Sequence, residues 1–245
     1  MFQIPRRIAY WSFFFCFAGK LALAQEKGNP TLNLEPEVWE EVLRFGAIFA
    51  GAMLLPVVLI STTAFLRVFL TLAFLKKALS ISECLPIILL FALSLLLGAL
   101  IMMPTYQKVY RTSLLPYLDK QLSPQQAIQK GIQPFREFMF SHVRQKDLAL
   151  FVELSMKASP KSKEDIPTRV LLPAFLTSEL HRGFAMGVFL FLPFLLIDIL
   201  VASVLAALNM QTLPHQNIAL PVKIALFVSV DGWSLLFSGI WKSFH

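Results

Sequence analysis

Three ionisable side chains lie within apolar stretches near the C-terminal end of the sequence. Asp198 falls in an apolar segment over about 184–208, and Lys223 and Asp231 fall in another over about 216–241. A charge at the centre of a bilayer costs about 3 kcal/mol on insertion scales, so such residues are functional candidates by default. Their types allow an ion pair or a proton relay.

The spacing of these charges indicates which of them can pair. Lys223 and Asp231 are separated by about 12 Å along a helix axis, which is too far for direct contact. If the two segments form a hairpin about residue 213, Asp198 lies about 7 Å from Lys223 in depth. That offset is awkward within one hairpin and suits a neighbouring copy. An internal bundle pair, or a charge facing a water-filled cavity, is equally compatible with these residues.

The composition places the chain among membrane proteins. Hydrophobic residues make up 56% of its 245 residues and charged residues 15%. A soluble domain is about 45–50% apolar and about 25% charged. The net charge of +7 comes from basic residues scattered along the chain. We therefore expect a membrane partner and no nucleic acid.

The N-terminus has the features of a cleavable secretory signal. A basic start, MFQIPRR, precedes the apolar stretch IAYWSFFFCFAG, which is short for a membrane span. Ala22 and Ala24 then supply the small residues of a cleavage site, so we expect residues 1–24 to be removed before Gln25. An uncleaved N-terminal anchor is the alternative. A polar exported linker is expected over 25–43.

Four apolar segments and one long polar stretch follow the linker. We expect a first apolar helix pair over 44–103, a helical domain over 104–183, and a second apolar hairpin over 184–245 with its turn at 209–217. Ser123 followed by proline is typical of a helix start. With the mature N-terminus outside, the 104–183 domain is exported and the basic pair after the first segment faces the cytoplasm, as the positive-inside rule favours.

The sequence contains no pattern typical of an enzyme or a metal site. Its four histidines are scattered, and it lacks H-E-x-x-H, S-x-x-K, G-x-S-x-G and glycine-rich phosphate loops. We therefore expect no enzyme activity, no cofactor and no metal. An autonomous ion- or proton-coupled transporter that uses Asp198, Lys223 and Asp231 as a relay stays an alternative, although no internal repeat supports it.

Four long blocks follow one another along the chain. They read LPVVLISTTAFLRVFLTLAFLKKAL, GIQPFREFMFSHVRQKDLALF, RVLLPAFLTSELHRGFAMGVFLFLPFLLIDILVASVLAAL and IALPVKIALFVSVDGW. Together they resemble the FliP family of flagellar and virulence type III export proteins, over about 54–244. The resemblance implies an all-α membrane fold of helical hairpins with an exported helical domain, assembling into a pseudo-hexameric helical export gate.

The resemblance also implies a function and partners. Several copies would join FliQ-like and FliR-like subunits in the inner membrane, within the flagellum basal body, with the exported domain in the periplasm. Together they would form the channel through which unfolded flagellar substrates are secreted. In such an assembly, charges in apolar helices can pair at contacts that are shielded from lipid.

Single residues take roles from the same resemblance. Lys223 and Asp198 occupy the places of an inter-subunit ion pair. An assembly or channel-entrance role falls to Phe138, Phe151 and Glu179.

The turn after the third apolar segment is where the family carries a run of methionines, which form a gasket that closes the pore. Here this pore turn consists of Met210, Gln211, Thr212 and Leu213. A single methionine therefore remains, and thioethers suit a gasket because they are unbranched and repack easily. Arg67 and Asp231 are embedded charges to which we assign no role.

Overall fold

The structure is a computed structural model that describes residues 43–47, 49–51, 53, 60–81, 86–155, 160, 162–210 and 213–244. It divides into two compact units, Met1–Leu54 and Leu55–His245. All helices discussed below belong to the second unit. The signal peptide expected over 1–24 and nearly all of the linker expected over 25–43 lie outside the described residues.

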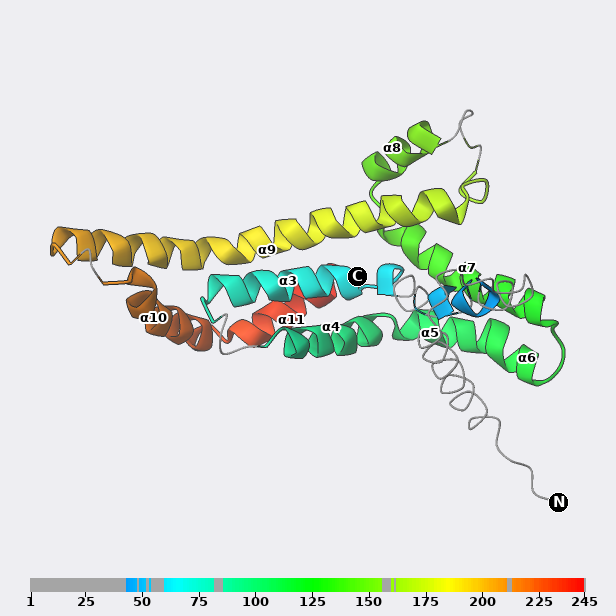
Figure 1. Ribbon diagram of the computed structural model, residues 1–245, viewed down its shortest axis with the longest axis horizontal. Coiled ribbons are helices and arrows are strands. Elements are labelled where there is room, and N and C mark those ends of the chain that lie inside the picture. The colour runs from blue at the N-terminus through cyan, green and yellow to red at the C-terminus, as the bar shows by residue number, and fades with distance from the viewer. Residues whose placement is uncertain are drawn as a thin grey trace, which may run out of the picture. The chain divides into compact units, whose positions relative to one another are not determined.

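Every regular element of the second unit, within its described residues, is helical (Figure 1). In chain order these are α3 (Phe65–Ala78), α4 (Ile87–Ile101), α5 (Met103–Val109), the π-helical turn η1 (Tyr110–Leu114), α6 (Leu115–Leu118), α7 (Pro124–His142), α8 (Gln145–Ser155), α9 (Thr168–Ala207), α10 (His215–Ser229) and α11 (Gly232–Lys242).

The helix α9 is long and apolar enough to cross a membrane. Its 40 residues span about 60 Å. Two bent pairs could each form a further span: Ile87–Ile101 with Met103–Leu118, bent by 61°, and α10 with α11, bent by 65°. The expected class, an all-α membrane protein, is confirmed.

Local sequence signals explain where several of these helices begin and end. The start of α7 at Ser123 is confirmed: its side chain accepts from the Gln126 backbone, and the Gln126 side chain accepts from the Ser123 backbone. The end of α9 is a Schellman motif, in which Met210 N donates to Leu205 O and a left-handed Asn209 follows the last helical turn.

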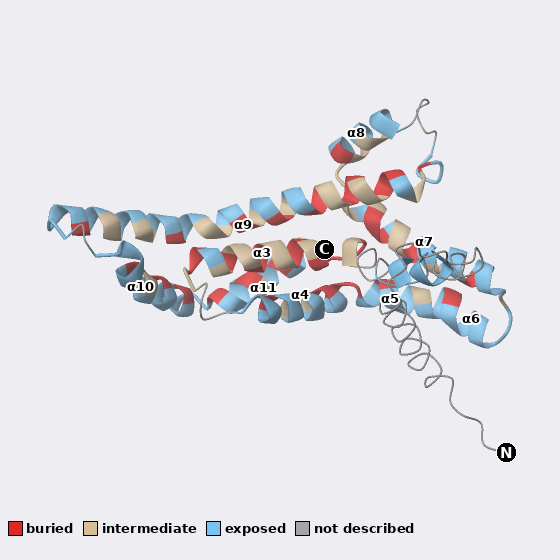
Figure 2. Ribbon diagram, viewed as in Figure 1, coloured by how far each residue is buried: buried red, intermediate tan, exposed pale blue. Residues whose placement is uncertain are grey.

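The helix α3 forms the centre of the packing, with α9 and α4 against it (Figure 1). Seven of its residues are buried, and Figure 2 shows buried positions along its length. Gly183 and Gly187 lie one turn apart on α9 and face Leu70 and Phe74 of α3. On α4, a Cβ added to Gly98 would lie 3.3 Å from the Phe65 backbone. Small residues at these positions let the helix axes approach closely, as is common between membrane helices.

A leucine at Gly187 is expected to push α9 away from α3. Even an added Cβ at this position would overlap the Phe74 ring. Overpacking of this kind typically costs about 1–3 kcal/mol, so Gly187→Leu should lower the melting temperature of the protein in detergent-solubilised membranes. The matched control is Gly239→Leu on α11, where an added Cβ meets nothing within 4 Å. Equal melting of the two variants would contradict close packing at Gly187.

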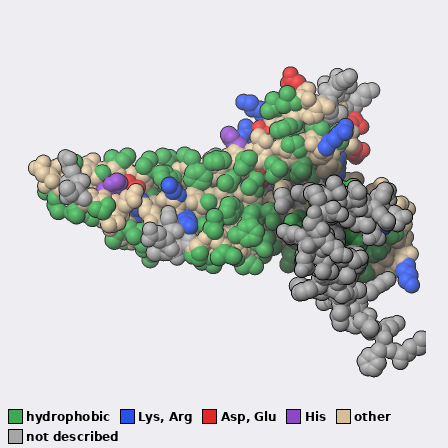
Figure 3. Space-filling view, in the orientation of Figure 1, with side chains coloured by type: hydrophobic (Ala, Val, Ile, Leu, Met, Phe, Trp, Pro, Cys, Tyr) green, Lys and Arg blue, Asp and Glu red, His purple; other side chains and the backbone are tan. Residues whose placement is uncertain are grey.

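Apolar side chains cover the visible face of α9 and α4, whereas charged side chains gather around α8 (Figure 3). Large exposed apolar residues on α9 include Phe184, Phe189 and Leu192. An apolar surface of this kind marks contact with lipid or with other subunits.

Candidate functional site

Lys223 is the centre of the first buried charge cluster. Its side chain is 1% exposed, and its Nζ lies 2.7 Å from Asp198 Oδ2 on α9. The same ammonium donates to Ala78 O at 2.9 Å and to Ser80 Oγ at 3.0 Å. An ammonium has three N–H donors, and all three find acceptors here. One side chain of α10 therefore ties together α9, the end of α3 and the turn that follows it.

The contact between Lys223 and Asp198 lies within one chain. The sequence predicted that Lys223 and Asp198 would lie at depths about 7 Å apart in a single hairpin, and that prediction is wrong for this contact. The offset was calculated for two straight rods, whereas α10 contains Pro221 and the four-carbon lysine stem extends across the remaining distance. Pairing between copies stays a prediction, but this argument for it is removed.

Asp198 depends heavily on this lysine. Its Oδ1 is buried and has no hydrogen-bond partner among the described residues. A carboxylate with one satisfied oxygen would be left without any strong partner if Lys223 were removed, and a stranded buried charge is strongly destabilising.

Asp231 has a different position. It lies at the 65° bend between α10 and α11 and adopts the left-handed conformation, with φ 50° and ψ 52°. It forms no ion pair with the other described residues. Aspartate tolerates this conformation better than most residues, and Gly232 follows it. The structure thus gives Asp231 a backbone role in breaking the apolar segment into two helices.

Arg67 and Glu179 form a second buried pair, which joins α3 to α9. Both side chains are 0% exposed. Arg67 Nε donates to Glu179 Oε2 at 2.9 Å, and Nη2 donates to Oε1, so the contact is bidentate. The remaining nitrogen, Nη1, donates to Ser243 O at 2.7 Å and to Ser243 Oγ at 3.1 Å, and the guanidinium lies 3.7 Å from the centre of the Phe244 ring. The pair therefore also fastens the segment after α11.

The sequence alone does not connect Arg67 with Glu179. They are 112 positions apart, and no spacing rule links them. The available signal was that Arg67 is a lone charge in an apolar block and that Glu179 carries the opposite charge.

Phe138 of α7 lies beside this second cluster. Its ring is 6.0 Å from that of Phe175 and 6.4 Å from that of Phe244. His142, one turn further along α7, lies with its Nε2 3.2 Å from Phe244 O. Phe138 and Glu179 thus sit around the same C-terminal segment. Phe151 of α8 is half-buried and packs against the apolar core.

The pore turn is described in part. Met210 is 44% exposed, and Leu213 is similarly open. Gln211 and Thr212 lie outside the described residues. The turn joins the end of α9 to the start of α10, so the Lys223–Asp198 contact holds the hairpin that presents it.

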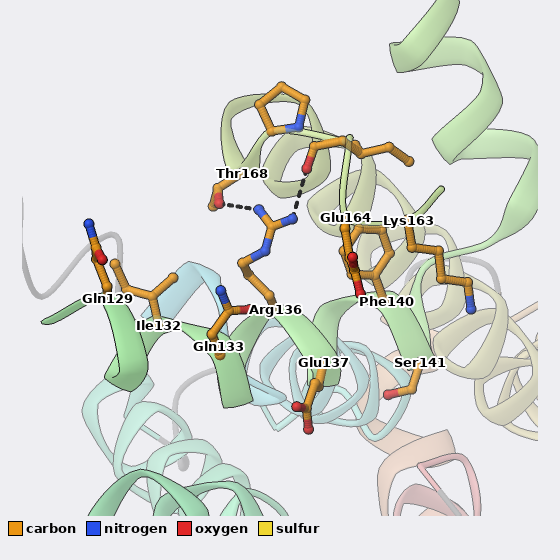
Figure 4. A pocket seen from close by; sticks show the side chains of 12 residues that line it. Gln129, Ile132, Gln133, Arg136, Glu137, Phe140, Ser141, Lys163, Glu164 and Thr168 are labelled. Atoms are coloured by element: carbon orange, nitrogen blue, oxygen red, sulfur yellow. Dashed lines mark hydrogen bonds between the residues drawn. The ribbon is translucent and has the colours of Figure 1, made fainter. Parts of the chain in front are cut away.

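A cleft of about 720 Å³ lies between α7 and residues 163–168 (Figure 4). Arg136 spans it, donating to Thr168 Oγ1 at 2.6 Å and to Ile166 O at 2.8 Å. These bonds hold the start of α9 against α7, which is a structural role. Across the described residues, no group of three His, Cys, Asp or Glu side chains could hold a metal ion.

Comparison with known proteins decides the family. The FliP family model matches residues 48–240. The chain belongs to the FliP family. The flagellar biosynthetic protein FliP of Caulobacter vibrioides is 39% identical over 224 residues, which is 91% of this chain and 84% of that protein. FliP of Pectobacterium carotovorum is 41% identical over 207 residues (84% and 80%), and FliP of Bacillus subtilis is 39% identical over 210 residues (86% and 95%).

Membership of the FliP family confirms the resemblance on which several expectations rest. The match covers both ion pairs and the pore turn. Its relatives are flagellar biosynthetic proteins, and the helix α9 is able to span a membrane, so this chain is a membrane protein of flagellar biosynthesis and export.

Proposed function

We propose that the chain is a core subunit of the type III protein-export gate, through which unfolded flagellar substrates leave the cytoplasm. The observation that carries the proposal is the FliP family match over residues 48–240. The two ion pairs support it, because they join α3 to α9 and α9 to α10. A channel wall needs such connections between its helices so that its lining keeps its shape.

The proposed gate contains several copies of this chain with FliQ-like and FliR-like partners, in a pseudo-hexameric helical arrangement. The exposed apolar residues of α9 supply surface for these contacts. Phe138, Phe151 and Glu179 would act at the assembly or channel-entrance region. The gate lies in the inner membrane within the basal body, and the helical stretch 104–183 faces the periplasm.

An autonomous transporter has less support from the geometry. A proton relay needs side chains that can pass protons to neighbouring groups along a pathway. All three N–H donors of Lys223 are already hydrogen-bonded. Asp231 has a backbone role at the bend. Neither observation favours a relay through Asp198, Lys223 and Asp231.

Copurification tests the gate against the transporter. The affinity-tagged chain, expressed with FliQ-like and FliR-like subunits, should be isolated from membranes as one large complex, and it should aggregate or be degraded when expressed by itself. A stable monodisperse monomer that moves ions or solutes in liposomes would instead establish the transporter.

The pore turn supplies a further test of the gate. If Met210, helped by Leu213, closes the pore, Met210→Ala should make cells that express the full complex leak small ions, because the shorter side chain leaves the gap unfilled. The matched control is Met103→Ala, since Met103 is 52% exposed and Met210 is 44% exposed. If the Met210→Ala complex assembles and leaks no more than the control, another element closes the pore.

A further inference from the structure

Ser80 has an unusual backbone conformation for its residue type. It follows the end of α3 with φ 58°, in the left-handed region that glycine adopts without strain. Its N–H donates to Lys77 O, and the N–H of Ile81 donates to Lys76 O. These two bonds form a Schellman motif, in which the left-handed position is usually glycine. A serine at this position needs a compensating interaction.

The side chain of Ser80 supplies that interaction. Its Oγ accepts a hydrogen bond from Lys223 Nζ at 3.0 Å. The described chain has three other non-glycine residues with positive φ: Lys120, Asn209 and Asp231. Ser80 is the one among these four whose side chain contacts a buried charge.

Lys223 in turn completes the end of α3. The carbonyl of Ala78 belongs to the last turn, where no intrahelical donor remains, and Lys223 donates to it. A positive charge at a helix C-terminus also interacts favourably with the helix dipole. Ser80 Oγ is therefore the third acceptor of the Lys223 ammonium, beside Ala78 O and Asp198 Oδ2, and it helps to orient the ammonium toward Asp198.

We propose that Ser80 is a positioning residue, which holds the Lys223 ammonium against Asp198 and fastens the turn after α3 to the hairpin of α9 and α10. The proposal goes beyond the export function, because it concerns how the ion pair is oriented in any assembly. Its tests therefore measure the folded protein and not secretion.

Three substitutions separate the hydroxyl from the backbone. Ser80→Ala removes the hydroxyl and keeps the strain, so it should lower the melting temperature most. Ser80→Gly removes both the hydroxyl and the strain, so its melting temperature should lie between those of Ser80→Ala and the wild type. Ser80→Asn keeps an acceptor oxygen and tolerates the left-handed conformation, so it should restore stability. In a Lys223→Met background Ser80→Ala should have no further effect, and Ser80→Gly should be the more stable of the two because it still relieves the strain.

A second measurement covers the case in which Lys223→Met fails to fold. Labelling of Lys223 by an amine-reactive reagent, quantified by mass spectrometry on the purified complex, should rise about tenfold in Ser80→Ala, as expected for the loss of one hydrogen bond to a charged group. Labelling should stay near the wild-type rate in Ser80→Asn. Unchanged labelling in Ser80→Ala, or an equal effect of Ser80→Ala with and without Lys223, would overturn the proposal.

Discussion

Arg67→Ala is expected to prevent stable folding of the chain in the membrane. The substitution leaves the Glu179 carboxylate fully buried and unpaired, which typically costs about 3–5 kcal/mol. A domain has about 5–15 kcal/mol of total stability, so this loss is a large part of the whole. It also releases Ser243 and Phe244, which Arg67 holds. Immunoblots of membrane fractions should show little intact protein.

The same pair offers a test of its cause. Glu179→Ala should be as harmful as Arg67→Ala, whereas the double variant Arg67→Met with Glu179→Leu should be milder than either, because no charge is then stranded. The matched control is the exposed pair Lys108–Glu137, 3.0 Å apart with side chains 64% and 62% exposed, where Lys108→Ala should cost under about 1 kcal/mol. If Arg67→Ala were as mild as Lys108→Ala, the pair would contribute little to stability.

Lys223→Ala is the second substitution with a large expected effect. It removes the partner of Asp198 and the donor to Ala78 O together, so a loss of about 3–5 kcal/mol is expected. Assembly of the complex, measured by native gel, should fail, and so should motility. Lys223→Arg should be much milder, because it keeps the charge and several donors.

Charge reversal tests whether the contact between position 223 and the carbonyl of Ala78 contributes to stability. In the double variant Lys223→Asp with Asp198→Lys, the new carboxylate would face the carbonyl of Ala78 at the C-terminal end of α3, where negative charge is unfavourable. We therefore expect the reversed pair to stay defective. Full recovery would show that attraction between positions 198 and 223 is the whole contribution.

Cysteine pairs distinguish the arrangement within one chain from the arrangement between copies. In a background with Cys16→Ala and Cys84→Ala, Lys223→Cys and Asp198→Cys placed in one chain should form a disulfide while the protein keeps the mass of a monomer. Placed separately in two coexpressed copies, they should give a covalent dimer only if the pair also forms between copies. A dimer would instead establish the inter-subunit pair that the sequence led us to expect.

Patterns that act over short distances in the chain were predictable. The start of α7 follows from Ser123 and the proline after it, and the spans follow from long apolar runs. The break at Asp231 was treated as a charge in a continuous segment, although an aspartate followed by glycine is itself a turn signal. The boundary expected between 183 and 184 lies inside α9, because the helix continues where the composition changes.

Contacts between distant positions were not predictable from spacing. Arg67 and Glu179 meet because α3 and α9 pack side by side, which depends on Gly183 and Gly187. Ser80 could not be assigned either, since its role depends on a backbone angle and on a lysine that lies 143 positions away.

The length of α9 has a mechanical consequence. A helix of about 60 Å is twice as long as the hydrocarbon core is thick, about 30 Å, and typical tilts are too small to fit it inside. Part of α9 must therefore stand outside the lipid as a rigid rod. Both of the other candidate spans contain a bend above 60°, whereas α9 continues through Pro173 and Pro193 without a break. The part of α9 that packs against α7 and α8 and the part that ends at the turn after Ala207 therefore belong to one uninterrupted helix.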